Sequence, residues 1–297
     1  MRWKDGRQSN NIEDMRSAAG PAMGGISILF RIIPFLLGSK MGRVLLVVGV
    51  IGYFGARMLG IDLLQLASPT PGSGAETQNA ANQPNAQDQE LVSFVSVVLA
   101  STEDTWKLMF NNMGANYEEP VLVLFRNSVN SACGYAQAAM GPFYCPGDHK
   151  LYIDLSFYED MKNKLGAPGD FAQAYVIAHE VGHHVQTLLG ISEKINQAQQ
   201  NLSEVEANRI SVKFELQADC FAGIWGRHTE QKALIESGDL EEALNAAAAI
   251  GDDKLQQQSR GVVRPENFTH GTSRQRVEWF KRGFEKGRIE DCNTFEQ

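Results

Sequence analysis

The stretch "AYVIAHEVGHHVQTLLG", residues 174–190, holds three histidines and a glutamate within six positions, and most other positions are apolar. It follows the turn "GAPGD", residues 166–170, so we predict a buried helix opened by Asp170 and Gln173 and ended by Gly190. Side chains four residues apart share one face of a helix. His179 and His183 therefore lie one turn apart, where both imidazoles can bind one tetrahedral metal ion.

This pattern is HExxH, which supplies two zinc ligands and a general base. Glu180 sits one step round the helix, close enough to reach a metal-bound water rather than the metal. Gly182 is costly inside a helix, so it indicates close approach by a neighbouring element. His184 lies about 100° round the helix from His183 and cannot join His179 on one ion. We expect His184 to have a surface, core or supporting role rather than to be a ligand.

A catalytic zinc needs a third protein ligand and one position left open for water. The candidates are Glu215, Asp219 and His228 downstream and His149 upstream. Glu215 is best placed, at the middle of a predicted helix in "FELQADC". Asp219 falls one turn later on the same face, where it can accept a hydrogen bond from a ligating imidazole. His228 is the reserve candidate, and the alternative is that both acids lie on a solvated helix face.

Local patterns elsewhere predict a mostly helical α+β domain with a small sheet. Ser203 and Glu206 form a capping box that opens a second long helix. The predicted helices cover about residues 91–110, 170–190, 203–225, 240–250 and 274–286, and the predicted strands cover residues 120–127 and 150–157.

A second apolar stretch lies nearer the N-terminus. Val44 to Ile61 is apolar apart from Arg57. At about 1.5 Å per residue its length approaches the roughly 30 Å hydrocarbon core of a bilayer, so we predict one transmembrane helix. Lys and Arg concentrate before this segment and are sparse after it until Lys107. The positive-inside rule then places the N-terminus in the cytoplasm and the rest of the chain outside. A buried core helix is the alternative.

Charge and composition divide the chain further. Residues 1–60 carry eight Lys/Arg against three Asp/Glu, whereas the whole chain has a net charge of −8. The acidic remainder argues against nucleic acid as a partner. Residues 67–90 have almost no large apolar side chains and are typical of a flexible linker. We therefore predict four segments: a basic cytoplasmic tail (1–43), a transmembrane helix (44–61), a flexible linker (62–90) and a folded domain (91–297).

The four cysteines, Cys133, Cys145, Cys220 and Cys292, all follow the predicted transmembrane helix. None forms a CxxC pair, which argues against a zinc ribbon or a thioredoxin-like motif. In an exported domain an even number indicates two disulfides, with three possible connectivities. We favour Cys133–Cys145, which closes a short local loop, together with Cys220–Cys292. Buried free thiols are the alternative if the orientation is reversed.

Six stretches together resemble one known family. They are "MRWKDGRQSNNIEDMR", "SACG", "GPFYCP", "HEVGHHVQ", "ELQADCFAG" and "THGTSRQRVEWF". They are similar to the bacterial neutral zinc metallopeptidase family, and the resemblance spans almost the whole chain. It implies a zincin-like domain of gluzincin type with one zinc ion per chain. It also implies a single-pass anchor in the bacterial inner membrane, with the catalytic domain in the periplasm.

The same resemblance implies roles for single residues. "ELQAD" is similar to the ligand helix of related zinc proteases, which supports Glu215 as third ligand and Asp219 as the group that orients a ligand. In those relatives a late histidine, followed six residues on by an arginine, lies beside the substrate oxyanion, and His270 and Arg276 have this spacing. The stretch "GPFYCPGDHKLYID" is similar in place to the edge strand that binds substrate backbone in many zincins.

The expected function is hydrolysis of peptide bonds in a protein or peptide substrate. Zinc on its three ligands would lower the pKa of a bound water to about 7 and polarise the scissile carbonyl. Glu180 would act as general base, and His270 and Arg276 would stabilise the oxyanion. One alternative is a non-catalytic, membrane-tethered zinc protein that serves as an interaction or assembly module. Another is a hydrolase of cell-wall amides. The sequence leaves the substrate and the oligomeric state open.

Overall fold

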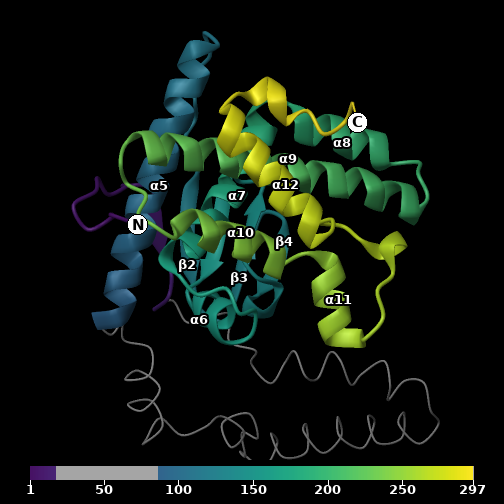
Figure 1. Ribbon diagram of the computed structural model, residues 1–297, viewed down its shortest axis with the longest axis horizontal. Helices are drawn as coiled ribbons and strands as arrows, with labels where there is room; N and C mark the ends of the chain where they lie inside the picture. Colours follow the sequence, from purple (N-terminus) through teal and green to yellow (C-terminus); the bar gives the residue numbers. More distant parts are fainter. Residues whose placement is uncertain (18–85, 297) are drawn as a thin grey trace, which may run out of the picture. The chain divides into compact units, whose positions relative to one another are not determined.

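A four-stranded sheet forms one layer of the fold, with the strand order β1-β2-β6-β5. The computed structural model describes residues 1–17 and 86–296 (Figure 1). In the sheet β1 (Ile12–Asp14), β2 (Val121–Phe125) and β6 (Lys150–Asp154) run parallel, and β5 (Phe143–Cys145) pairs antiparallel with β6. β2 is apolar, and both β2 and β6 are almost wholly buried, as strands covered on both faces are. β5 therefore forms one edge of the sheet.

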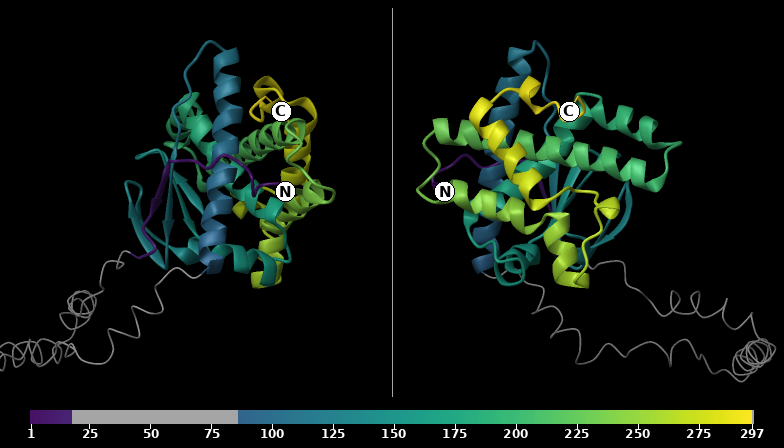
Figure 2. Two further views of the ribbon diagram at one scale, coloured as in Figure 1. Left: turned by 90° about the vertical axis from the view of Figure 1, so that its left-hand side faces the viewer. Right: turned by 45° about the vertical axis from the view of Figure 1, so that its right-hand side comes forward.

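Helices make up most of the described chain. Figure 2 shows the helices nearest the C-terminus, drawn in yellow-green and yellow, on the opposite side of α5 from the strands. A hairpin of β3 (Ser128–Ser131) and β4 (Gly134–Gln137) lies between β2 and β5 in the sequence. The helices are α5 (Ala86–Asn112), α6 (Ser156–Asn163), α7 (Asp170–Leu188), α8 (Ile191–Gln199), α9 (Glu204–Gln231), α10 (Asp239–Ala249), α11 (Asp252–Arg260) and α12 (Ser273–Lys286). Three short 3-10 turns are η1 (Ala138–Met140), η2 (Pro265–Asn267) and η3 (Ile289–Cys292).

The HExxH stretch forms α7, the most deeply buried helix, and it runs between α5, α9 and α10. It begins after Gly169 and ends before Gly190, whose φ of 69° is the left-handed conformation expected just past a helix. Asp170 does not cap the helix, because its carboxylate accepts a hydrogen bond from the α-ammonium of Met1 instead. The capping box of Ser203 and Glu206 opens α9 as predicted.

Small residues allow the helices around α7 to approach closely. A Cβ added to Gly182 would lie 3.0 Å from the carbonyl oxygen of Ala218 on α9. Glycines also line the crossing of α9 with α12, where a Cβ on Gly283 would lie 1.9 Å from the carbonyl oxygen of Cys220. Backbone contact of this kind brings Asp219 of α9 beside Arg276 of α12.

The first seventeen residues belong to the same compact unit as residues 86–296. β1 pairs with β2, and the α-ammonium of Met1 lies 3.0–3.2 Å from the carboxylates of Asp170 and Asp239. Ser9 and Asn11 donate hydrogen bonds to the buried carboxylate of Glu103 on α5. Polar side chains thus attach this segment to the helices, while the backbone of β1 attaches it to the sheet.

Two of the expectations are wrong. Among residues 1–17 and 86–296 there is no helix long and apolar enough to cross a membrane, and the predicted segment Val44–Ile61 lies outside the described residues. The described fold is mostly helical α+β with a small sheet, and the single transmembrane helix is not supported. The location must be corrected as well. A cytoplasmic N-terminus with a periplasmic catalytic domain would separate β1 from β2, but these strands pair in one sheet.

Candidate active site

Three polar side chains of the motif lie on α7 beside one cavity of about 750 Å³. His179 and Glu180 are buried and His183 is half-buried. The rings of His179 and His183 have centroids 4.8 Å apart and stand nearly perpendicular. The four-residue spacing therefore places both imidazoles at the cavity, and Glu180 lines the same space.

Glu215 of α9 completes this group of side chains. Its carboxylate oxygens lie 3.1 Å from Nε2 of His179 and 3.4 Å from Nε2 of His183. The three candidate ligand atoms all lie within 4.8 Å of one another. Within residues 1–17 and 86–296, neither His149 nor His228 belongs to a cluster of this kind. A second acidic cluster, Asp170, Asp239 and Glu242, lies around the α-ammonium of Met1.

Hydrogen bonds to the other ring nitrogens fix both imidazoles. Nδ1 of His179 donates to Asp219, and Nδ1 of His183 lies 2.8 Å from Oε1 of Gln186. The amide nitrogen of Gln186 donates to the carbonyl of Phe214, so its oxygen must face His183 and accept. Both histidines consequently carry a hydrogen on Nδ1, and both Nε2 atoms face the carboxylate of Glu215, at 3.1 and 3.4 Å. This arrangement is typical of ligating histidines, whose orientation is held by a second group.

Two further side chains, Arg276 and Tyr175, hold Asp219. Nε of Arg276 donates to Oδ2 of Asp219 at 2.8 Å, and a second guanidinium nitrogen donates to Oδ1 at 3.0 Å. The hydroxyl of Tyr175 also donates to Oδ1. Arg276 is only 2% exposed, and its third nitrogen donates to the carbonyl of Ile250. The structure thus places Arg276 beside His179, bonded to Asp219.

These contacts shift the pKa values of the cluster in one consistent sense. Burial opposes charge on each group, but the neighbours outweigh it. Asp219 and Glu215 raise the pKa of His179 to about 10, while Arg276 and His179 hold the pKa of Asp219 at about 2. The two histidines keep the pKa of Glu215 well below its usual range. The site therefore favours positive charge between its histidines and Glu215, which a divalent cation also supplies.

His270 lies at the rim of the cavity under different constraints. Its side chain is 49% exposed, and Nδ1 faces the hydroxyl of Thr269 at 3.0 Å and Asp252 at 3.4 Å. Asp252 also accepts hydrogen bonds from the backbone N–H groups of residues 269–271. His270 and Arg276 line the same cavity, but Arg276 is fully engaged and His270 is not.

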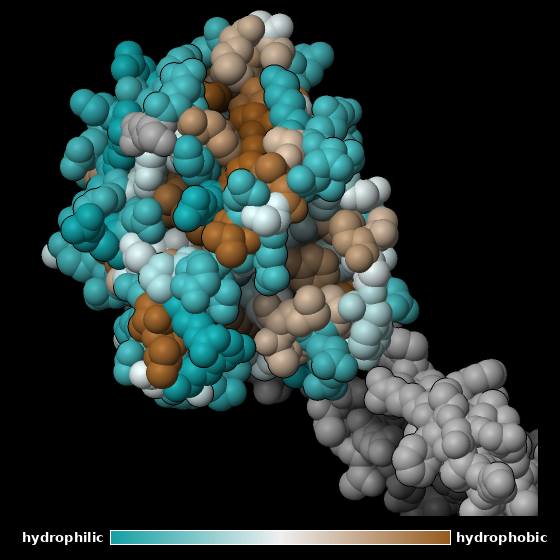
Figure 3. All heavy atoms as spheres, turned by 90° about the vertical axis from the view of Figure 1, so that its right-hand side faces the viewer, coloured by the Kyte–Doolittle hydropathy of each residue, from teal (hydrophilic) through white to brown (hydrophobic). Residues whose placement is uncertain are grey.

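Two groups of residues line this cleft. The helical wall comprises the lining residues of α7, α9 and α12, and the strand wall comprises residues 138–146, which include η1 and β5. Figure 3 views the side of the molecule that carries α8 and α11, and it shows apolar residues exposed along a furrow framed by polar ones. The lining is largely apolar, with Phe157, Phe214 and Leu255 among its members.

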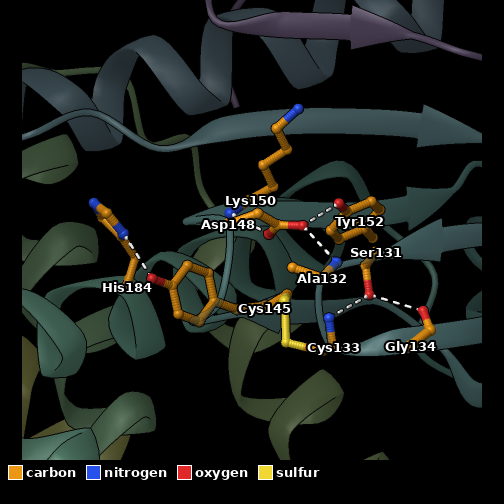
Figure 4. The surroundings of a disulfide bond; sticks show 10 residues. Ser131, Ala132, Cys133, Gly134, Cys145, Asp148, Lys150, Tyr152 and His184 are labelled. Carbon is orange, nitrogen blue, oxygen red and sulfur yellow. Dashed lines mark hydrogen bonds between the residues drawn. A yellow bond between two sulfur atoms is a disulfide. The ribbon is translucent and has the colours of Figure 1, made fainter.

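His184 lies against the strand wall, where its Nδ1 hydrogen-bonds with the hydroxyl of Tyr144 (Figure 4). Burial lowers its pKa to about 4, and its partner Tyr144 has a pKa raised by burial to about 12. The next residue of β5, Cys145, forms a disulfide with Cys133. The second disulfide, Cys220–Cys292, ties α9 to η3, so the structure contains the pairing that we favoured from the sequence.

Sequence reasoning missed two members of the site. Tyr175 lies four residues before His179, and Gln186 lies three residues after His183, so both share the helix face of the histidine that they support. Helical spacing from each histidine was the available signal. It identifies neighbours on a face but does not say which of them bond, because the partners on α9 and α12 are remote in sequence.

The geometry agrees with the comparisons with known proteins. Residues 1–295 match the family described as "Putative neutral zinc metallopeptidase". The chain is 55% identical over 297 residues to the uncharacterized protein YpfJ of Escherichia coli (strain K12), covering 99% of both chains. It is 38% identical over 213 residues to the uncharacterized protein Mb2605 of Mycobacterium bovis, covering 68% of this chain and 71% of that protein. No solved structure matches. The chain belongs to the zinc metallopeptidase family of that description.

Proposed function

We propose that this protein hydrolyses peptide bonds with one zinc ion per chain, held by His179, His183 and Glu215. The observation that carries the proposal is the convergence of their three ligand atoms within 4.8 Å, at an open cleft that Glu180 also lines. Family membership supports a zinc-dependent peptidase acting on a protein or peptide.

The donor set suits zinc. Two imidazole nitrogens and a carboxylate are the ligands of one class of catalytic zinc sites, in which a fourth position stays open. The hydrogen bonds at each Nδ1 leave both Nε2 atoms free to bind the ion. A zinc ion bound here would polarise the scissile carbonyl and acidify the attacking water.

Glu180 is proposed to move the proton. Among the residues that the structure describes, no hydrogen bond or ion pair engages its carboxylate, so it is free to accept a proton from the water. It then returns this proton to the leaving nitrogen, which must be protonated before the peptide bond separates. Burial at 8% exposure keeps the carboxylate facing the cleft rather than bulk water.

The oxyanion is proposed to be stabilised by His270. Its Nδ1 is turned to Thr269 and Asp252, which leaves Nε2 available to donate into the cleft. The bond with Asp252 raises the pKa of His270, against the effect of burial, and so favours the charged form that stabilises an anion best. Arg276 contributes through Asp219, by fixing the acceptor that orients His179.

The substrate backbone is proposed to pair with β5. Within the described residues this strand is bonded to β6 alone, so its outer edge is free to accept an extended peptide as a further strand. Main-chain pairing gives affinity with little sequence preference, and the apolar lining of the cleft favours apolar side chains near the scissile bond.

The decisive test is Glu180→Gln. The variant should retain one zinc per chain, because Glu180 is not a ligand, and should lose peptide hydrolysis by about 100-fold or more. Metal content is measured by mass spectrometry and turnover with a quenched fluorescent peptide library. Glu193→Gln, an exposed glutamate on the neighbouring α8, is the matched control and should keep full activity. Undiminished turnover by Glu180→Gln would refute the mechanism.

A further inference from the structure

Of the three histidines in the motif, His184 has no part in the proposed metal site. It directly follows His183 on α7 and is fully buried. Its Nε2 lies 2.7 Å from the carbonyl oxygen of Glu118, and its Nδ1 lies 3.1 Å from the hydroxyl of Tyr144. A carbonyl only accepts, so Nε2 carries the hydrogen and Nδ1 accepts from Tyr144. Both ring nitrogens are used, and the ring has one orientation.

Tyr144 is the middle residue of the edge strand β5. The strand has three residues and is flanked by Pro142 and Pro146, which have no N–H group to extend the pairing. Tyr144 lines the cleft, and its hydroxyl hydrogen-bonds with Nδ1 of His184 on α7. Through this one side chain the edge strand is bonded to the helix that carries the metal-binding histidines.

Packing restricts the same contact further. The ring of His184 lies edge-to-face against Tyr117, Tyr144 and His149, with centroids 5.4–5.7 Å apart. On the other side of β5, the Cys133–Cys145 disulfide ties the strand to the end of the β3–β4 hairpin (Figure 4). The strand is thus held by its pairing with β6, by the disulfide and by His184, and the restraint by His184 leads to the helix of the metal cluster.

We propose that His184 is a positioning residue for the substrate. Through Tyr144 it fixes the separation between β5 and the His179–His183–Glu215 cluster, so that a peptide paired with β5 presents its scissile carbonyl to the cluster. His183 and His184 are consecutive residues of α7. The helix backbone therefore connects the candidate metal ligand His183 directly to the residue that contacts β5. The inference rests on the proposed peptidase function.

The test is Tyr144→Phe, which removes only the hydroxyl. Two substrates are compared: a peptide of about eight residues that pairs along β5, and a blocked dipeptide that spans only the scissile bond. For the long peptide KM should rise about five- to tenfold, the effect of losing one hydrogen bond, with kcat within about twofold. The dipeptide kinetics, zinc content and melting temperature should not change. A purely structural role would affect both substrates equally.

A double-mutant cycle sharpens this test. His184→Gln keeps an amide donor for the Glu118 carbonyl but loses the acceptor at Nδ1, so it should raise KM as Tyr144→Phe does. The double variant should show no further increase, because both changes break one contact. Tyr152→Phe, which removes a hydroxyl bonded to Asp148 in the same sheet, is the matched control and should leave KM unchanged.

Two results would overturn the inference. If the wild-type protein cleaves the long peptide and Tyr144→Phe has the same KM, the positioning role fails while the peptidase function stands. If the zinc-loaded wild-type protein cleaves neither substrate, the peptidase function fails and the inference falls with it.

Discussion

The helical wall and the strand wall of the cleft are built by different means. On the helical wall both candidate histidine ligands are fixed through a second polar group, His179 by Asp219 and His183 by Gln186. The strand wall is held by backbone pairing with β6, by one disulfide and by the contact of Tyr144 with His184. Its surface is half exposed, and Met140 reaches 71% exposure.

This difference separates two tasks. Groups that bind a metal must be placed to fractions of an ångström, and a network in which every partner is itself bonded provides that accuracy. A strand that recognises peptide backbone offers its own N–H and C=O groups, and it needs only the correct height and direction. Changes in the helical wall should therefore alter metal affinity and stability together, whereas changes in the strand wall should alter KM.

The largest effect is expected for Asp219→Ala. The substitution leaves the buried guanidinium of Arg276 without a counter-charge and removes the acceptor for Nδ1 of His179. We expect a loss of about 3–5 kcal/mol in unfolding free energy and about 10- to 100-fold in zinc affinity. Chemical denaturation and titration against a competing chelator measure the two quantities.

Asp160→Ala is the control for that experiment. Asp160 lines the same cavity but pairs with Lys164 at the surface, so its removal should cost less than about 1 kcal/mol. Wild-type zinc affinity in the Asp219→Ala protein would mean that the helical wall does not depend on its network of polar partners.

The two disulfides test the walls separately. Cys220–Cys292 closes a span of 72 residues in the helical wall, and Cys133–Cys145 closes one of 12 beside the strand wall. Replacing each pair by serines should cost about 4 and about 3 kcal/mol of stability respectively, since longer loops lose more chain entropy on closure. Zinc affinity should fall only in the first variant, and KM for a long peptide should rise only in the second. Equal loss of zinc in both would remove the distinction between the walls.

Helical spacing explains how much of the site was predictable. Start and stop signals predicted α7 and α9, and helical spacing placed His179 with His183, and Glu215 with Asp219, on one face of each helix. Contacts between elements were beyond this reasoning. The oxyanion role that the resemblance implies for Arg276 stays a prediction, but its contact with Asp219, which depends on the glycine-mediated crossing of α9 and α12, was not predicted.

The fold of the N-terminal segment, residues 1–17, could not be predicted from its local sequence. β1 has the sequence "IED", and neither its length nor its composition predicts a strand. Its place is set by pairing with β2, more than a hundred residues away, and by side chains that bond to α5. A charge count over residues 1–60 therefore suggested a tail, because the partners that hold these residues in the fold are not visible locally.

The smallest effect concerns the rim between the walls and depends on pH. The hydrogen bond with Asp252 raises the pKa of His270, against burial, and hydrogen bonds from His270 hold the pKa of Asp252 below its usual value although burial opposes it. Because the pKa of His270 is raised in the folded state, the contribution of the pair is present below pH about 6.5 and is lost as pH rises through the folded pKa. His270 is 49% exposed, so solvent screening limits this contribution to a few tenths of a kcal/mol. Proton NMR titration should give a lower pKa for His270 in Asp252→Asn than in the wild type. An equal pKa in the two proteins would show that Asp252 acts only on the backbone of residues 269–271. The position of His270 would then be set by backbone hydrogen bonds, as the strand wall is, and not by charge.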